Sequence, residues 1–247
     1  MVPARPAEVK PKQALGKIAL GKAETMEIDI FSDTICPWCF IGKRRLERAL
    51  RERPQPKLTI RWRAFQLNPD MPAEGMERRS YLELKFGGAA NAEAVYAQVR
   101  AAGDSEEIPF AFDKIGRTPN TVESHRLIRY AHQQGRQDET VEALFQAYFL
   151  RGENIGDPEV LIAAAREAGL DPEAARAFLG SEAEAIAVRA EDAQARQAGI
   201  NGVPCFIFDG KYALAGAQPP EVLYQLFDLA LQGDAKDASQ APAPGEA

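Results

Sequence analysis

The chain has 247 residues, of which 45% are hydrophobic and 27% are charged. These values are typical of a folded globular protein and exclude a peptide or a disordered chain. Thirty basic residues against 36 acidic ones give a net charge of −6, which disfavours a broad nucleic-acid-binding surface. Three cysteines are too few for a secreted disulfide framework. No run approaches the roughly 20 apolar residues that span a bilayer, so we expect a cytoplasmic protein.

The two ends of the chain lack a periodic apolar face. Residues 1–25 are basic and contain three prolines, and residues 233–247 are rich in Ala, Pro and Asp. We therefore predict a disordered N-terminal extension and a disordered tail. Met26 directly precedes the first strand-like run, so a shorter natural start and an added leader both stay open.

A βαβ pattern follows the N-terminal extension. Apolar and polar residues alternate over residues 27–32 and again over 58–65, which predicts two strands. Between them, Cys36 occupies the N-cap position of a helix, and Pro37 occupies the first helical position, where its missing N–H costs nothing. The apolar residues of this helix recur every three or four positions. This spacing places Cys39 on the buried face and Cys36 at the exposed first turn.

Helical signals dominate from residue 67 to 199. Strand patterns return at residues 203–208 and 211–214 on either side of an Asp-Gly pair, which is a strong hairpin signal, and a last amphipathic helix follows. The predicted organisation is therefore an α/β domain split between residues 26–66 and 200–232. An all-helical insertion, residues 67–199, separates its two parts.

The Cys-Pro-Trp-Cys motif of residues 36–39 carries the chemistry. The dipole and the free N–H groups of a helix start favour the ionised form of a thiol placed there. Cys36 can then attack a substrate disulfide, and Cys39 can resolve the mixed disulfide by attacking Cys36. Two thiols in one helical turn therefore predict redox chemistry.

Half of a zinc site is the other interpretation of a Cys-x-x-Cys pair. Such a site needs two further ligands, usually from a second close pair. The remaining candidates are Cys205, His125 and His132, and none of them forms such a pair in the sequence. We therefore expect no metal.

Three stretches of the sequence resemble the DsbA-like branch of the thioredoxin superfamily, and within it the FrnE-like cytoplasmic thiol:disulfide oxidoreductases. They are IDIFSDTICPWCFIGKRRLERAL from Ile28, NTVESHRLIRYAHQQG from Asn120 and GVPCFIFDGKYALAGAQPPEVL from Gly202. The resemblance covers residues 27–231 and extends to 2-hydroxychromene-2-carboxylate isomerases and kappa-type glutathione transferases. It implies a thioredoxin fold of the α/β class with a large helical insertion.

The resemblance also implies a substrate-binding loop with a cis-proline, which matches the Val203–Pro204 step. Pro37 and Trp38 of the motif are expected to bind substrate together with this loop. Position 205 is usually a bulky apolar residue in the family, whereas this chain has Cys205. Strand alternation places Cys205 on the same side as Val203. It is therefore either a modulating thiol near the motif or a small buried hydrophobe.

Four further residues are candidates for the site. Asp33, three residues before Cys36, either modulates proton transfers or caps the turn. Asn120, His125 and Arg126 lie in the second matched stretch. The helical insertion walls the substrate groove in the glutathione-dependent relatives, so we interpret these three as substrate-binding residues. The alternative is that they are surface polar residues of an amphipathic helix.

We therefore predict a thiol:disulfide oxidoreductase or isomerase that acts on disulfide-containing proteins or glutathione. It needs no bound cofactor; glutathione is a candidate co-substrate, and a thioredoxin or glutathione system is the expected reducing partner. Neither nucleic acid nor a membrane is an expected partner. Two alternatives stay open. One is a glutathione-dependent isomerase or transferase, although such relatives lack the thiol at the Cys39 position. The other is a non-catalytic holdase that binds peptides.

Overall fold

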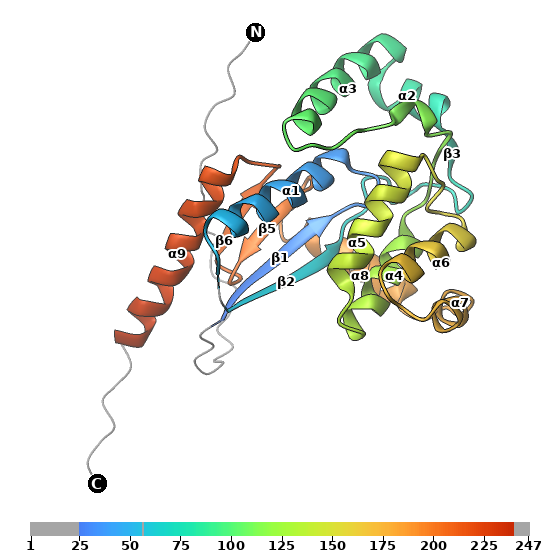
Figure 1. Ribbon diagram of the computed structural model, residues 1–247. Coiled ribbons are helices and arrows are strands. Elements are labelled where there is room, and N and C mark those ends of the chain that lie inside the picture. Colours follow the sequence, from blue (N-terminus) through green and yellow to red (C-terminus); the bar gives the residue numbers. More distant parts are fainter. Residues whose placement is uncertain (1–24, 56, 240–247) are drawn as a thin grey trace.

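The computed structural model describes residues 25–55 and 57–239 (Figure 1). The strands are β1 (Met26–Ser32), β2 (Leu58–Ala64), β3 (Met76–Glu77), β4 (Arg117–Thr118), β5 (Cys205–Phe208) and β6 (Tyr212–Ala215). The α-helices are α1 (Pro37–Glu52), α2 (Arg78–Phe86), α3 (Ala89–Asp104), α4 (Val122–Gln133), α5 (Gln137–Phe145), α6 (Pro158–Glu167), α7 (Pro172–Leu179), α8 (Ala185–Gln197) and α9 (Pro220–Ser239). A 3₁₀ turn spans Phe112–Lys114, and a π-helical turn spans Gln146–Arg151.

Four strands form the central sheet in the order β2-β1-β5-β6. β1 runs parallel to β2, and α1 is the crossover between them. β5 runs antiparallel to both β1 and β6. The predicted hairpin is confirmed: Asp209 and Gly210 join β5 to β6 with φ angles of 49° and 65°. Asp and Gly tolerate these positive φ values better than other residues do.

Alternation along the strands gives the sheet two packed faces. Ile30 and Phe206 point into the main core, which also contains apolar residues of α1 and α9. These two helices contact each other and lie along the same face of the sheet (Figure 1). Cys205 and Ile207 point to the opposite face and pack near Ala195 of α8. A strand that is buried on both faces has a continuous run of apolar residues, and this pattern predicted the strand at β5.

The edge strand β2 is covered by side chains of the helical insertion. The Trp62 N–H donates to the side-chain carbonyl of Gln137, and the Gln137 amide donates back to the Trp62 carbonyl, both at 3.0 Å. The Ala64 N–H donates to a carboxylate oxygen of Glu191 at 2.8 Å. These bonds satisfy backbone groups that an edge strand otherwise offers to another chain. They also tie α5 and α8 to the sheet.

An aromatic core joins α1 to the insertion. The ring of Phe40 stacks on that of Phe145 with 5.1 Å between centroids, and Phe149 lies 6.2 Å from Phe40. The predicted apolar stripe of this region is fully buried, which confirms its interpretation as core. Its members are Val141, Leu144, Phe145, Tyr148 and Phe149.

The structure differs from the prediction in two places, the insertion and the C-terminal helix. The insertion is not entirely helical, because β3 and β4 pair antiparallel with Met76 opposite Thr118. A two-residue strand is too short to leave an alternating pattern in the sequence. Helix α9 continues to Ser239, past the predicted start of a disordered tail at residue 233. Ala and Lys in that stretch are good helix formers, so its composition was misleading.

Other predictions on the organisation of the chain are not decided by these elements. Residues 1–24 and 240–247 of the two predicted disordered ends lie outside the described residues. The division into a split domain and an insertion stays a prediction. Within residues 25–239, residue 56 apart, no helix combines the length and the apolar character that crossing a bilayer requires.

Candidate active site

The dithiol motif forms the first turn of α1. Cys36 is the N-cap residue with extended backbone angles, and Pro37 follows at the first helical position, as predicted. The Cys36 N–H donates to the Asp33 carbonyl at 3.0 Å, and the Cys39 N–H donates to the Cys36 carbonyl at 3.0 Å. The Cys36 side chain makes no capping bond to the helix. The sulfur instead faces the thiol of Cys39 and the carbonyl of Val203.

Both sulfurs of the motif are buried. The side chain of Cys39 is completely inaccessible, as predicted, but Cys36 is only 4% exposed, so the expectation of an exposed thiol was wrong. Helical spacing shows which residues face the core, but it does not show which loops cover the start of a helix. The exposed part of the turn is formed by Pro37 and Trp38, which are half-buried.

Burial raises the pKa of Cys39 well above its usual value. The neighbouring sulfur of Cys36 adds to this rise, because a negative charge there disfavours a second one nearby. Contacts with the Ser32 side chain and the Asp33 backbone act in the opposite direction and are weaker. Cys39 is therefore a neutral thiol at pH 7, and the structure gives the two cysteines different environments.

The Val203–Pro204 loop lies against the motif. Its peptide bond is cis, as the resemblance implied. The Cys36 Sγ donates to the Val203 carbonyl oxygen at 3.6 Å, across 167 residues of sequence. Gly42 of α1 permits this approach, because a Cβ at that position would lie 3.0 Å from Cγ of Pro204. The loop therefore places a backbone edge beside the sulfur that begins the motif.

Asp33 contacts the insertion and does not cap α1. Its carboxylate is fully buried; Oδ2 accepts from the Leu67 N–H at 2.6 Å. The other oxygen, Oδ1, lies 3.6 Å from Nε2 of His125, and neither atom has a hydrogen-bond partner among the described residues. The residues next to Asp33 and His125 also meet, with the hydroxyls of Thr34 and Ser124 2.8 Å apart. The loop before the motif is thus held against α4 by two neighbouring polar contacts.

The predicted substrate-binding roles of His125 and Arg126 are not supported, because both side chains are about 2% exposed. Arg126 donates to backbone carbonyls at the end of α7 and in the loop before α8, including those of Phe178 at 3.1 Å and Ala183 at 2.7 Å. Asn120 is half-buried and donates to the Met71 carbonyl at 2.6 Å. These side chains hold loops in place. Amphipathic spacing did not reveal this, because their partners are distant in sequence.

Cys205 lies on the other face of the sheet from the core that contains the motif. It is opposite Phe31 in the β1–β5 register and belongs to the cluster under α8. Val203, in the loop that precedes β5, packs against this cluster as well as against the main core, which agrees with the expectation that Cys205 and Val203 share a side. Contact of Cys205 with the motif stays a prediction. A small buried hydrophobe is the interpretation that this packing favours.

Two residues beside the Asp33 loop, Asn68 and Tyr81, were missed by the sequence analysis. Tyr81 lies on α2, in the insertion. The Tyr81 hydroxyl exchanges hydrogen bonds with the side chain of Asn68, which follows the Leu67 that contacts Asp33. Asn68 and Tyr81 also line an open pocket beside this loop. Their spacing along the chain carries no pattern that points to residues 36–39.

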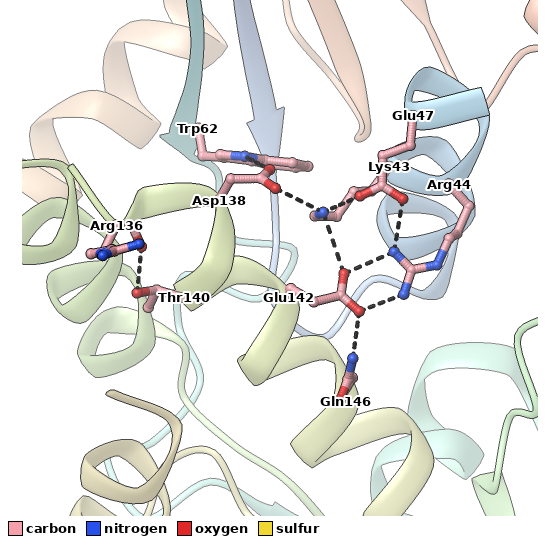
Figure 2. Close-up of polar contacts among 9 residues, drawn as sticks. All are labelled: Lys43, Arg44, Glu47, Trp62, Arg136, Asp138, Thr140, Glu142 and Gln146. Carbon is pink, nitrogen blue, oxygen red and sulfur yellow. Dashed lines mark hydrogen bonds and ion pairs between the residues drawn. The ribbon is translucent and has the colours of Figure 1, made fainter. Parts of the chain in front are cut away.

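An ionic network fixes the helix that carries the dithiol (Figure 2). Lys43 is 3% exposed, and its Nζ contacts carboxylates of Glu47, Asp138 at 3.0 Å and Glu142 at 3.3 Å. Burial alone would lower the pKa of Lys43, but the charges of Asp138 and Glu47 outweigh it and raise that pKa. The indole N–H of Trp62 donates to Asp138 at 2.9 Å. α1, α5 and β2 are thereby connected one turn beyond Cys39.

No cluster of metal ligands accompanies the dithiol. In the part of the chain that the structure describes, no group of three or more His, Cys, Asp or Glu side chains is arranged to hold a metal ion. Cys36 and Cys39 are both free thiols. What the arrangement can do chemically is reversible disulfide formation between a sulfur at a helix start and a buried neutral thiol behind it.

The chain is similar to known proteins over most of its length. The family model described as a DSBA-like thioredoxin domain matches residues 27–228. The uncharacterized protein YwbO of Bacillus subtilis (strain 168) is 24% identical over 213 residues, covering 86% of this chain and 98% of that protein. The crystal structure of the probable DsbA oxidoreductase SCO1869 from Streptomyces coelicolor has a TM-score of 0.73 at 30% identity. The matched region covers 90% of this chain and 94% of that chain.

A more distant structure shares the fold. The cytosolic disulfide reductase DsbM from Pseudomonas aeruginosa has a TM-score of 0.58 at 18% identity, with 82% of this chain and 99% of that chain covered. The family match includes the motif, the whole helical insertion and the cis-proline loop. With a four-stranded sheet that carries a dithiol at the start of its first helix, the chain belongs to the family of proteins with a DSBA-like thioredoxin domain.

Proposed function

We propose that this protein is a thiol:disulfide oxidoreductase in which Cys36 is the nucleophile and Cys39 is the resolving thiol. The observation that carries the proposal is the asymmetry of the dithiol. Cys36 begins a helix and its sulfur is 3.6 Å from the Val203 carbonyl, whereas Cys39 is completely buried with a raised pKa. We propose that Cys36, which is 4% exposed, meets the substrate, and that Cys39, which is inaccessible, reacts only within the chain.

The reaction has two exchange steps. The ionised sulfur of Cys36 attacks a substrate disulfide; one substrate sulfur leaves as a thiolate and the other becomes bonded to Cys36. Cys39 then loses its proton, and its thiolate attacks the Cys36 sulfur. The Cys36–Cys39 disulfide forms and the second substrate thiolate leaves. The substrate gains two electrons and the protein loses two, and the reverse sequence oxidises a substrate dithiol.

The cis-proline loop supplies the binding edge in this proposal. The Val203 carbonyl lies 3.6 Å from the Cys36 sulfur, so a substrate bonded to that sulfur would lie beside the Val203 backbone. An extended peptide can form backbone hydrogen bonds with such an edge, as in strand addition. Pro37 and Trp38 form the exposed surface of the same turn. We propose that Pro37, Trp38, Val203 and Pro204 contact the substrate.

The substrates that fit this chemistry are disulfide-containing proteins and glutathione. A solved DsbM structure holds glutathione, and we propose glutathione as a co-substrate here because the reaction accepts any small thiol that reaches Cys36. A cytoplasmic location and a thioredoxin or glutathione reducing system complete the proposal. The small number of cysteines supports that location.

Single-cysteine variants test the proposal. We expect wild type in glutathione buffers to form the Cys36–Cys39 disulfide reversibly and to reduce insulin disulfides. Cys39→Ala should accumulate a mixed disulfide at Cys36, which mass spectrometry of peptides detects, and Cys36→Ala should be inactive. Cys205→Ala is the matched control, since it removes a buried thiol on the other face of the sheet and should retain activity.

The alternatives give different results in the same experiments. Full turnover of a glutathione conjugate by Cys39→Ala would indicate a glutathione-dependent transferase or isomerase. Suppression of aggregation by a Cys36→Ala/Cys39→Ala variant, with no disulfide formed in wild type, would indicate a holdase. Either outcome would overturn the oxidoreductase proposal.

A further inference from the structure

An open pocket lies in the helical insertion, beside the loop that precedes the dithiol. Its volume is about 380 Å³, which falls within the range of about 300–1,000 Å³ that ligand pockets take. The segment that follows β2 and the helix α2 both contribute to it. Apolar side chains make up most of the lining, and they include Leu67, Met71, Met76, Tyr81 and Leu84. The dithiol chemistry proposed above uses none of these residues.

Short contacts connect the pocket with the dithiol. The Cys36 N–H donates to the Asp33 carbonyl at 3.0 Å, and the Asp33 carboxylate accepts from the Leu67 N–H at 2.6 Å. Leu67 also packs against the core cluster that contains both sulfurs, as Val203 of the cis-proline loop does. The pocket therefore begins where the parallel strands β1 and β2 end, and the dithiol lies at the same end of the sheet. Ligands of α/β proteins commonly bind outside the carboxyl ends of the strands.

Helix α2 is bonded to the segment that follows β2. Nδ2 of Asn68 donates to the Tyr81 hydroxyl at 3.2 Å, and Nζ of Lys85 donates to Oδ1 of Asn68 at 3.4 Å. These bonds hold the two sides of the pocket together. Burial raises the pKa of Tyr81, and negative charges at Asp33 and Cys36 add to the rise, which agrees with the place of this phenol beside the dithiol.

Apolar side chains of the pocket are open to solvent. Leu84 is 75% exposed, and Met76 and Tyr81 are half-buried. Scattered apolar residues on a surface need no explanation, but Leu84 extends an apolar lining, and such a surface is one that a partner can cover. The charged residues of the lining, Asp70 and Lys85, have opposite signs. The pocket therefore suits an uncharged apolar group.

A polypeptide substrate supplies such a group next to its cysteine. Two hydrogen bonds separate Cys36 from Leu67, and an extended chain advances about 3.3 Å per residue, so side chains within a few positions of the bonded cysteine can span this gap. Glutathione carries carboxylates and an ammonium group but no large apolar side chain. It can react at Cys36, but it has nothing that matches the apolar lining.

We propose that this pocket binds an apolar side chain of a polypeptide substrate, close in sequence to the cysteine that bonds to Cys36. The inference rests on the proposed function and names the preferred substrate class, which is a polypeptide with a large apolar residue near its cysteine. The Val203 edge contacts the backbone of that polypeptide, and the pocket selects a side chain. The helical insertion thus contributes to the choice of substrate.

A leucine scan of peptide disulfides tests the inference. Each substrate is a symmetric disulfide of a short Gly-Ser peptide with one cysteine, and leucine replaces serine at one position at a time on either side of that cysteine. Reduced full-length protein in excess reacts in a single turnover: Cys36 bonds to one peptide, the other leaves as a thiol, and Cys39 then releases the first. Acid quenching, alkylation and chromatography measure the released peptide. The rate with dithiothreitol corrects for the intrinsic reactivity of each disulfide.

We expect leucine at one or two positions to raise the second-order rate constant about tenfold over serine. This is the low end of the range of about 10–200-fold for an apolar group that enters a pocket. In Leu84→Ser the leucine-to-serine ratio should fall to about threefold or less, because part of the apolar surface is gone. Ile186→Ser is the matched control, since Ile186 of α8 is 83% exposed and does not line the pocket. Its ratio should equal that of wild type.

Three results overturn the inference. The first is a rate constant that leucine does not raise at any position. The second is a leucine preference that Leu84→Ser, folded as judged by circular dichroism, retains in full. The third is a preference that Ile186→Ser loses to the same extent as Leu84→Ser, because the loss would then not depend on the pocket.

A second copy of the chain is the alternative occupant of the pocket. Sedimentation velocity of wild type and Leu84→Ser tests it. We expect the same oligomeric state for both. A wild-type dimer that Leu84→Ser dissociates would assign the pocket to that second copy and would overturn the inference.

The failure of this inference is distinguishable from the failure of the proposed function. If wild type releases no thiol from any peptide disulfide or from glutathione disulfide, the oxidoreductase proposal fails, and the inference fails with it. If wild type reacts with all of these substrates at rates that leucine does not change, only the role of the pocket is wrong.

Discussion

Replacing Lys43 with methionine tests how the dithiol helix is held. The Nζ of Lys43 is buried among Glu47, Asp138 and Glu142, at 3.0 Å from Asp138 and 3.3 Å from Glu142. Methionine has a similar length but no charge, so three carboxylates lose their shared cation (Figure 2). Arg44 still contacts Glu47 and Glu142 in the variant.

The expected loss of stability follows from the exposure of these groups. Removing one partner of a fully buried ion pair costs about 3–5 kcal/mol. Here the side chains of Asp138 and Glu47 are 54% and 33% exposed, so water solvates them once Lys43 is gone. We therefore expect Lys43→Met to lower the free energy of unfolding by about 2–3 kcal/mol. For a chain of this size, that corresponds to a decrease in Tm of about 5–10 °C.

Urea and thermal denaturation monitored by circular dichroism measure this loss. Arg79→Met is the control, because the exposed Arg79–Glu83 pair should contribute less than about 0.5 kcal/mol. If Lys43→Met is as stable as this control, the network does not stabilise the fold. A variant more stable than wild type would mean that the desolvation of Lys43 exceeds its gain from the three carboxylates.

Three further predictions concern packing and ionisation. Gly42→Ala places a Cβ 3.0 Å from Pro204 and 3.2 Å from Phe206; overpacking of about 1–3 kcal/mol against a helix-propensity gain of about 1 kcal/mol should leave a net loss in urea denaturation. Burial would raise the pKa of Glu142, but Arg44 and Lys43 outweigh it and lower that pKa in the folded protein. The ionised Glu142 carboxylate therefore stabilises the fold at pH values above its unfolded-state pKa, and this stabilisation is lost as the pH falls through its folded-state pKa. Glu142→Gln should therefore be less stable than wild type at pH 7, and the difference should shrink near pH 3. Because the Cys39 pKa is raised by burial, resolution of a mixed disulfide in stopped-flow experiments should accelerate about tenfold per pH unit between pH 7 and 9; a flat profile would contradict this.

The local parts of the fold were predictable because their causes are local. A proline directly after Cys36 is enough to start a helix, and apolar residues at every third or fourth position are enough to turn Cys39 inward. An Asp-Gly pair between apolar runs is enough to form the hairpin. Each of these signals lies within about ten residues of the feature that it produces.

The surroundings of the dithiol depended on contacts between distant segments. The Cys36–Val203 contact, the Asp33–His125 approach and the Asp33–Leu67 hydrogen bond each bring together residues that are far apart in the chain. Periodicity distinguishes the buried side of a helix from the exposed one, but it does not tell which element covers that side. The same limit explains Arg126, whose spacing fits a polar surface residue although its partners are carbonyls at the end of α7 and in the loop before α8.

The secondary-structure elements and the reactive pair were therefore predictable from local residue patterns. The order of strands and helices, the dithiol at the start of α1 and the glycine-containing hairpin all follow from short-range sterics and spacing. The surroundings of that pair depend on long-range packing, because Leu67, His125 and the Val203 carbonyl come from three separate segments. Charges act through space, and the distances between them are set by packing of the whole chain.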